Sequence, residues 1–388
     1  MTGELLSALM AGIEKALPEA AALRRDIHAN PALSGREEPT RRAFVEKTDF
    51  LRWREVAHTG AWGRMGPDGP AVGLRAELDA LPIHESTGVE WESRTDGVMH
   101  ACGHDVHLAA LWALLQAARE LSLPVGLVPI LQPREEITPP GAVDVVASGL
   151  IEEEQIEAMI GVHLQPAVER GVVSTGAGAV NAGYDSFEIV VKGRPGHGAY
   201  PHIAIDPITT LASIIGAVSG LQTRVIDPTR PTVISFGEVQ GGTAPNVIAD
   251  QASCRGTIRT FSEGDRDLLH EGITRTAEAI AASRGAMAST RFVRGGPPLV
   301  NDPGLVHRID RTLSAAGITV AEAPFRSCGS DDFAEYCLST ASVMCFVGTG
   351  RVDGIGLHHG AFLPGRDALR LAAQTMAAGY VAAAELIA

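Results

Sequence analysis

Short apolar runs alternate with longer amphipathic segments along the chain. The runs that begin at Ala71, Val125 and Glu157 have the length and composition of buried strands, and residues 106–120 have helical spacing. This order predicts an α/β fold in which helices flank a sheet. Each run leads into polar residues, and ligands in such sheets collect beyond the carboxyl ends of the strands. The predicted strand ends therefore mark the place where a functional site is expected.

The pattern changes from about Gly183. A strand, a helix, two strands, a helix from about Asp265 to Ser283 and a final strand follow one another there. This β-α-β-β-α-β order predicts a ferredoxin-like α+β insert. After GGPPLVNDP the pattern again resembles that of the first part. We therefore expect one domain with a mixed sheet, made of residues 1–182 and 296–388, interrupted by a smaller domain of residues 183–295.

Composition narrows the class of partner. The length of 388 residues is typical of two domains. The net charge of −14, with no cluster of Lys and Arg, argues against a nucleic-acid partner. No segment approaches the ~20 apolar residues of a membrane span, and the N-terminal segment is amphipathic, unlike a signal peptide. The five scattered cysteines do not suggest a disulfide framework, so we expect a cytoplasmic protein. The net charge says little about whether the partner is a small molecule, because one well-placed Arg can bind a carboxylate inside an acidic protein.

The segment GVMHACGHDVH, residues 97–107, contains three histidines, a cysteine and an aspartate. Cys102 and His104 are two residues apart and share one side of an extended loop, and thiolate with imidazole is a ligand pair that borderline divalent ions select. For His100 and His107, capping or core hydrogen bonds are the preferred interpretation. Asp105 is expected to be the N-cap of the helix that follows.

Glu135 and Glu136 follow the second buried strand. Neighbours on an extended chain point to opposite sides, so one can bind a metal while the other faces water. The alternative is a solvated acidic loop, but the apolar run before them favours burial, and two buried carboxylates need a cation. His163 at a strand end and His358 in GLHHGAF are weak signals alone, and the set together indicates a metal centre.

Other hydrolytic chemistries fit the sequence poorly. There is no G-x-S-x-G motif for a serine nucleophile and no GxxxxGK[ST] loop for a phosphate. Cys102 could act as the nucleophile of a cysteine protease with a distant histidine as its base. That interpretation leaves the two glutamates and His163 without a role. His197, in a Gly/Pro-rich turn before a helix, could serve in capping.

The motifs, taken in order, resemble one protein family over about residues 24–369. They are RRDIHANPALSGREEPT, GLRAELDALPI, GVMHACGHDVH, LQPREE, GVHLQP, GHGAYPHIAIDP, GGTAPNVIAD, RGTIRTF, SDDFAEY and GLHHGAF. The sequence resembles the aminoacylase/carboxypeptidase family of di-metal metallopeptidases. Within it, the sequence is similar to the branch of N-acyl-amino-acid amidohydrolases, hippurate hydrolases and auxin-conjugate hydrolases. MHACGHD is highly specific to this branch.

The resemblance implies a metal-dependent amidohydrolase acting on N-acyl amino acids or small peptide-like amides. Two divalent ions, Zn or Mn, would be bound by five ligands: Cys102, His104, Glu136, His163 and His358. Glu135 would be the general base, His197 and Asn246 would polarise the scissile carbonyl, and Arg259 would hold the substrate carboxylate. The inserted domain would be a lid and dimerisation domain of a homodimer, with His197 able to act on the partner's site.

Two alternatives stay open at this point: a dipeptidase or carboxypeptidase with the same metals, and a non-catalytic metal-binding homologue. Glu135, which no purely structural site needs, favours catalysis. The sequence also departs from the branch at Glu77, Cys328 and Asp331, in the ITPPGA run after Glu136, in the shorter segment before residue 67, and in lacking Ser/Asn-Pro after His358. None of these departures touches the expected ligands or base, so they bear on the substrate.

Overall fold

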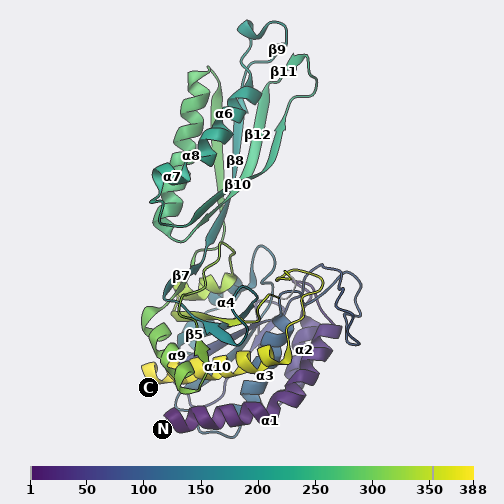
Figure 1. Cartoon of the computed structure of the whole chain (residues 1–388), viewed down its shortest axis with the longest axis vertical. Coiled ribbons are helices and arrows are strands. Elements are labelled where there is room, and N and C mark those ends of the chain that lie inside the picture. The colour runs from purple at the N-terminus through teal and green to yellow at the C-terminus, as the bar shows by residue number, and fades with distance from the viewer. Residues whose placement is uncertain (1, 352–353) are drawn as a thin grey trace. The chain divides into compact units, whose positions relative to one another are not determined.

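The computed structural model describes residues 2–351 and 354–388, which form two compact units (Figure 1). The large unit comprises residues up to Gly178, Val300–Phe325 and Asp332–Ala388, and the small unit comprises Ala179–Leu299 and Arg326–Asp331. Two short strands, β7 (Gly178–Asn181) and β14 (Leu299–Asn301), lie where the chain passes from one unit to the other.

An eight-stranded mixed sheet forms the centre of the large unit. Its strands lie in the order β1 (Arg54–Val56), β2 (Gly60–Trp62), β4 (Gly126–Gln132), β3 (Ala71–Glu77), β5 (Ile156–Gln165), β16 (Ala341–Gly348), β6 (Val172–Ser174) and β15 (Thr319–Val320). β4, β3, β5 and β16 are parallel neighbours, so their carboxyl ends share one edge. Every residue of β3 and β4 is buried, because helices cover both faces of the sheet. The predicted α/β class is confirmed.

Helices pack on both faces of this sheet (Figure 1). One face carries α1 (Thr2–Ala29), α3 (His104–Ala118), α9 (Pro303–Ala315) and α10 (Arg366–Ile387), and the other carries α4 (Gly141–Ala147) and the 3₁₀ helix η2 (Asp332–Leu338). The short helices α2 (Glu38–Glu46) and α5 (Leu150–Glu153) complete the unit. Gly12 lets α1 approach α3, because a Cβ there would lie 2.7 Å from the Cβ of Ala117.

The small unit is an antiparallel sheet covered on one face by helices. Its strands lie in the order β10 (Thr232–Gly241), β12 (Gln251–Thr260), β8 (Gly183–Lys192) and β13 (Met287–Arg294), with α6 (Pro207–Ser219), α7 (Gln222–Val225) and α8 (Glu263–Ser283) between them in the chain. The predicted β-α-β-β-α-β order is therefore confirmed. β9 (Gly196–His197), η1 (Pro201–Ile203) and β11 (Val247–Ile248) were not predicted.

Two local features differ from the sequence interpretation. Residues 326–331, expected in the interrupted domain, group with the small unit. Asp105 is not the N-cap of α3; Gly103 takes that position, and Asp105 lies in the first turn, where it is fully buried. Its carboxylate accepts hydrogen bonds from Arg24 Nε at 2.9 Å and His28 Nδ1 at 3.0 Å, so it joins α3 to α1.

One buried ionic group joins α8 to β8 in the small unit. Asp185 of β8 accepts hydrogen bonds from Arg266 Nε at 2.7 Å, His270 Nε2 at 2.6 Å and the Gly295 N–H at 2.9 Å. Burial opposes the ionisation of Asp185, but the hydrogen bonds from Arg266 and Gly295 hold the pKa of its carboxyl below the usual value. Ionised Asp185 therefore stabilises the packing of α8 on β8.

We expect Asp185→Asn to lower the free energy of unfolding by roughly 1.5–3 kcal/mol, the range for hydrogen bonds to charged groups. A carboxyl with a depressed folded-state pKa contributes its stability above the unfolded-state pKa and loses it as pH falls. The parent should therefore lose stability below about pH 4 more steeply than the variant. Urea unfolding between pH 3 and pH 7 measures both effects. Glu188→Gln, on the open face of the same strand, should change little, and equal slopes in parent and Asp185→Asn would contradict this assignment.

Candidate metal centre

Six of the sequence-predicted residues come together at the carboxyl edge of the parallel strands. Their donor atoms form overlapping groups of three, each with its atoms within 4.8 Å of one another. The groups are Cys102, His104 and His163; Cys102, Glu136 and His358; and His104, Glu135 and Glu136. They are supplied by the loop before α3, the start of α3, the end of β5, the bend after β4 and the segment before α10. We call these six residues the cluster.

His163 and Cys102 face each other across the cluster. The imidazole Nδ1 of His163 donates to the carbonyl oxygen of Leu164 at 2.7 Å, which leaves Nε2 without a proton in the neutral ring as inferred from this network. That Nε2 lies 3.4 Å from Cys102 Sγ. A ligating histidine is commonly oriented through its second nitrogen in this way. Both side chains are therefore presented with their metal-binding atoms toward the same space.

His104 is oriented by the strand end next to it. Its Nδ1 donates to the carbonyl oxygen of Asp79 at 2.8 Å, and its Nε2 is buried without a hydrogen-bond partner among the described residues. The turn into α3 needs glycine at 103, because φ is +90° and a Cβ would lie 2.9 Å from Leu164 Cδ1. The orphaned Nε2 points toward Glu135, whose Oε2 lies 3.8 Å away.

The two glutamates do not lie on an extended strand end. Arg134 has a φ of +54°, so the chain bends between β4 and the pair. As a result, both carboxylates reach His104, and the expectation that they face opposite ways is wrong. Glu136 is fixed by its N–H, which donates to Asp79 Oδ2 at 3.0 Å, and its Oε1 lies 3.3 Å from His358 Nε2.

His358 closes the cluster from the solvent side. Its backbone is in the left-handed region, with a φ of +62°, and its N–H donates to the Ala101 carbonyl at 2.9 Å. The side chain is 50% exposed, whereas that of Glu136 beside it is 10% exposed. The loop backbone, held by the segment that contains Cys102, thus presents the imidazole at the mouth of the site.

The donor set fits divalent metal ions. Burial and the neighbouring Glu136 carboxylate raise the pKa of the Cys102 thiol well above its usual value, so a thiolate here requires a cation. Two carboxylates, one thiol and three imidazoles within reach of one another are the mixture that Zn²⁺ and similar borderline ions select. His104 Nε2 and Glu136 Oε1 are both buried and lack hydrogen bonds within the described part of the chain, as expected of metal-binding atoms.

The other two histidines of the opening motif are not in the cluster. His107 donates from Nδ1 to Glu77 Oε2 at 2.9 Å and accepts the Leu164 N–H at Nε2 at 3.0 Å, which confirms its core role. His100 is buried, and neither ring nitrogen has a hydrogen-bond partner among the described residues, so the hydrogen bonds expected for it are absent there. Burial lowers its pKa to about 3, so His100 is neutral.

Sequence reasoning missed Asp79, which links the two halves of the cluster. Its carbonyl accepts from His104, while its Oδ2 accepts the Glu136 N–H and, at 2.7 Å, the Ser34 hydroxyl. The available signal was its position two residues beyond the end of β3, next to the strand β4 whose end leads into the two glutamates. A carboxylate at the edge where the site was expected was a candidate for such a link.

His197, Asn246 and Arg259 belong to the small unit. Strand β9 pairs His197 with Val247 of β11, and the Gly198 N–H donates to the Asn246 carbonyl at 2.8 Å, so His197 and Asn246 share one tip. Arg259 of β12 pairs with Tyr184 at the start of β8. Its guanidinium donates to Ser330 Oγ at 3.1 Å and lies 5.3 Å from the Tyr184 ring.

This arrangement separates His197 from Arg259. β8 has ten residues, and Tyr184 lies at its start while the His197 tip follows its end at Lys192. At about 3.3 Å per residue, the strand alone spans roughly 30 Å. The two residues therefore lie at opposite ends of the small sheet.

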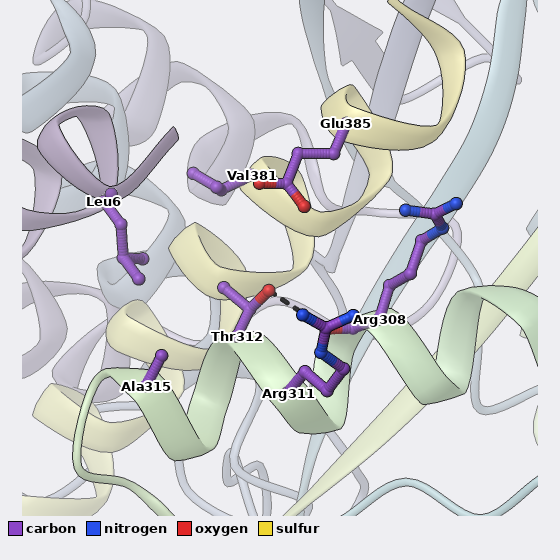
Figure 2. Close-up of a pocket in the computed structure, with 8 residues that line it drawn as sticks. Leu6, Arg308, Arg311, Thr312, Ala315, Val381 and Glu385 are labelled. Carbon is purple, nitrogen blue, oxygen red and sulfur yellow. Dashed lines mark hydrogen bonds between the residues drawn. The ribbon is translucent and has the colours of Figure 1, made fainter. Parts of the chain in front are cut away.

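The large unit also has a surface pocket of about 190 Å³ between α1, α9 and α10 (Figure 2). Its lining includes Leu6, Arg308, Thr312, Val381 and Glu385. It contains no member of the cluster and does not belong to the candidate metal centre. No helix in the described ranges combines the length and apolar character that a membrane span requires.

Comparison with known proteins matches this fold and cluster to one family. Residues 73–379 match Peptidase family M20/M25/M40. N-acetylcysteine deacetylase from Bacillus subtilis (strain 168) is 34% identical, with 92% of this chain and 94% of that protein covered. Thermostable carboxypeptidase 2 from Saccharolobus solfataricus is also 34% identical, with coverage of 90% and 92%. The crystal structure of Bacillus subtilis YXEP, described as a dinuclear metal binding peptidase from the M20 family, superimposes with a TM-score of 0.85 at 32% identity, covering 96% of this chain and 99% of that one.

The chain therefore belongs to peptidase family M20/M25/M40. It is an amidohydrolase, and the class expected from the sequence motifs is confirmed.

We expect Cys102→Ser to weaken metal binding, because a serine hydroxyl does not ionise at neutral pH and cannot replace a thiolate ligand. Elemental analysis after dialysis against dilute Zn²⁺ should show a metal content well below that of the parent. Cys254→Ser is the control, since Cys254 is also buried but lies in the core of the small unit. Equal metal content in the two variants would show that Cys102 is a core thiol.

Proposed function

We propose that this amidohydrolase cleaves the amide bond of N-acyl amino acids, using a water molecule and Glu135 as the general base. The observation that carries the proposal is the cluster: a buried donor set for cations with one carboxylate more than the five expected ligands need. The role given below to each residue of the cluster is part of this proposal.

Cys102, His104, Glu136, His163 and His358 would hold two divalent ions, Zn or Mn. When bound, the ions polarise the scissile carbonyl and make a water molecule more acidic. Glu136 joins the two sides of the cluster, because its carboxylate approaches both His358 and His104. The imidazoles of His104 and His163 are already oriented by the hydrogen bonds of their Nδ1 atoms.

Glu135 would take a proton from the attacking water and return it to the leaving amine. Its side chain is 10% exposed and lies beside His104 rather than in solvent. A carboxylate held beside the metal-binding atoms is placed to accept a proton from a water molecule there and to donate it to the leaving nitrogen. The same residue can serve both transfers, because the water and the leaving nitrogen occupy neighbouring positions on the tetrahedral carbon.

His197 and Asn246 would stabilise the oxyanion, and Arg259 would bind the substrate carboxylate, with the small unit as a lid. The separation of roughly 30 Å along β8 is hard to reconcile with His197 and Arg259 of one chain serving one small substrate. It supports a homodimer in which His197 acts on the partner's site, while Arg259 acts on its own.

The relatives support the substrate class. Two of them are named for deacetylation of N-acetyl amino acids, N-acetylcysteine deacetylase and N-acetyldiaminopimelate deacetylase. The carboxypeptidase relative supports a second candidate, cleavage of a C-terminal residue from small peptides. Both reactions use the same groups and differ in what lies on the acyl side of the amide. We further propose that the enzyme works in the cytoplasm on free small molecules.

A substrate panel tests this proposal. Protein loaded with Zn²⁺ or Mn²⁺ should release amine from N-acetyl, N-benzoyl or indoleacetyl amino acids faster than from dipeptides. Preference for dipeptides or for C-terminal residues of longer peptides would favour the second candidate. Full metal content without turnover on any amide would indicate a non-catalytic homologue.

The two glutamates should respond differently to amidation. Glu135→Gln keeps the shape and leaves both metals bound but removes the base, so kcat should fall by about 10²–10⁴-fold without rescue by added metal. Glu136→Gln removes a negative ligand, so metal affinity should drop and part of the activity should return at high metal concentration. Steady-state kinetics across a metal titration, with metal content measured in parallel, separates the two. The reverse pattern would exchange the roles.

Mixing two inactive variants tests the shared site. His197→Ala should keep both metals and lose about 10²–10³-fold in kcat, the effect of one lost oxyanion donor. After subunit exchange with Glu135→Ala, a mixed dimer contains one site with both residues intact, so partial activity should return. Exchange is verified by mass spectrometry of differently tagged subunits. Verified exchange without recovery would place His197 and Glu135 of each site in one chain.

A further inference from the structure

Glu37 is a buried carboxylate that none of the proposed catalytic roles uses. It lies just before α2 and is 0% exposed. Its Oε1 accepts the N–H groups of Gly35 at 2.7 Å and Arg134 at 2.9 Å, and its Oε2 accepts the Thr59 hydroxyl at 2.6 Å. These three donors are neutral, and two of them are backbone N–H groups. The carboxylate therefore acts as a fixed acceptor that ties together three separate segments.

The Arg134 N–H is the donor that connects Glu37 to the site. Arg134 has a φ of +54°, a left-handed backbone conformation that residues other than glycine and asparagine rarely adopt. Its own side chain donates hydrogen bonds to Asp144 and to the Pro139 carbonyl oxygen. The residue therefore serves the site through its backbone, which bends the chain directly before Glu135 and Glu136.

The same segment holds the bend from its other side. The Ser34 hydroxyl donates to Asp79 Oδ2 at 2.7 Å, and that oxygen also accepts the Glu136 N–H at 3.0 Å. Residues 34–37 thus fix the backbone before the glutamates through Glu37 and the backbone at Glu136 through Asp79. Because Asp79 also accepts from His104, a shift of this segment would move the glutamates relative to His104.

We propose that Glu37 is a positioning residue that holds the bend at Arg134 and so aims Glu135 and Glu136 at the metal centre. The proposal rests on the proposed roles of those two glutamates. It requires a side chain at position 37 that is long enough to accept the Arg134 N–H, and it does not require a negative charge there.

Two substitutions separate reach from charge. Glu37→Gln removes the charge, but its amide oxygen can accept the Gly35 and Arg134 N–H groups while its NH₂ donates to the Thr59 hydroxyl. Glu37→Asp keeps the charge and is one methylene too short to reach Arg134. We expect Gln to retain kcat and Co²⁺ affinity within about threefold, and Asp to lose about 10–100-fold in either, the usual effect of removing a group that orients ligands. KM should change less than kcat.

Thr48→Val is the matched control at the other end of α2. Thr48 is also 0% exposed, and its hydroxyl donates to the Phe44 carbonyl at 2.9 Å, so its loss destabilises the same region without touching the bend. Thermal melts normalise all variants for folded fraction. Per folded molecule, Thr48→Val should match the parent.

Three readouts are measured: kcat and KM on the best amide substrate, Co²⁺ binding by titration, and hydrogen exchange of the Arg134 amide. Rapid exchange at Arg134 in Glu37→Asp, with protection kept in Glu37→Gln, is the expected result. The proposal would be overturned if Glu37→Asp matched the parent in all three measurements, or if Glu37→Gln were as impaired as Glu37→Asp. If the parent cleaves no amide, the proposed function fails, while Co²⁺ affinity and exchange still decide whether Glu37 holds the bend.

Discussion

The structure depends on one electrostatic constraint: several acidic and basic side chains are buried together where parallel strands end. Such a group loses its hydration, and carboxylates without a cation or hydrogen bonds are costly to bury. The chain meets this cost in two ways. Glu37, and Asp79 through its Oδ2, accept hydrogen bonds from backbone and hydroxyl donors, whereas Asp79 Oδ1 has no hydrogen-bond partner among the described residues. Cys102, Glu136 and the orphaned Nε2 of His104 are left to be satisfied by cations.

These two kinds of buried group have different roles: one kind orients the backbone and the side chains of the site, and the other is left for the cations. Asp79 contacts His104 through its carbonyl and Glu136 through its carboxylate, so one residue sets the relative position of two expected ligands. Glu37 acts on the backbone that carries the base. None of these contacts uses the atoms that face the metal space, so orientation and chemistry are provided by different residues.

Much of this could be predicted from sequence. The buried runs of β3, β4 and β5 were clear from composition, and their parallel order brings Glu136 and His163 to one edge. The bend after β4 could not be predicted, because nothing in local propensity places an arginine at a φ of +54°. The partner of that arginine, Glu37, lies 97 residues away in the chain, and a pattern of apolar and polar positions does not encode such pairings.

Strand β8 sets a length that the chain can change only in coarse steps. Side chains alternate between the two faces, so inserting one residue into β8 would turn its apolar face, with Phe187, Ile189 and Val191, away from α6 and α8. Only paired insertions or deletions in β8 and its neighbours keep the core, and each pair changes the span by about 6.6 Å. The distance between the His197 tip and Arg259 can therefore change through β8 only in steps of this size. Any intermediate distance has to come from changes in the loop lengths.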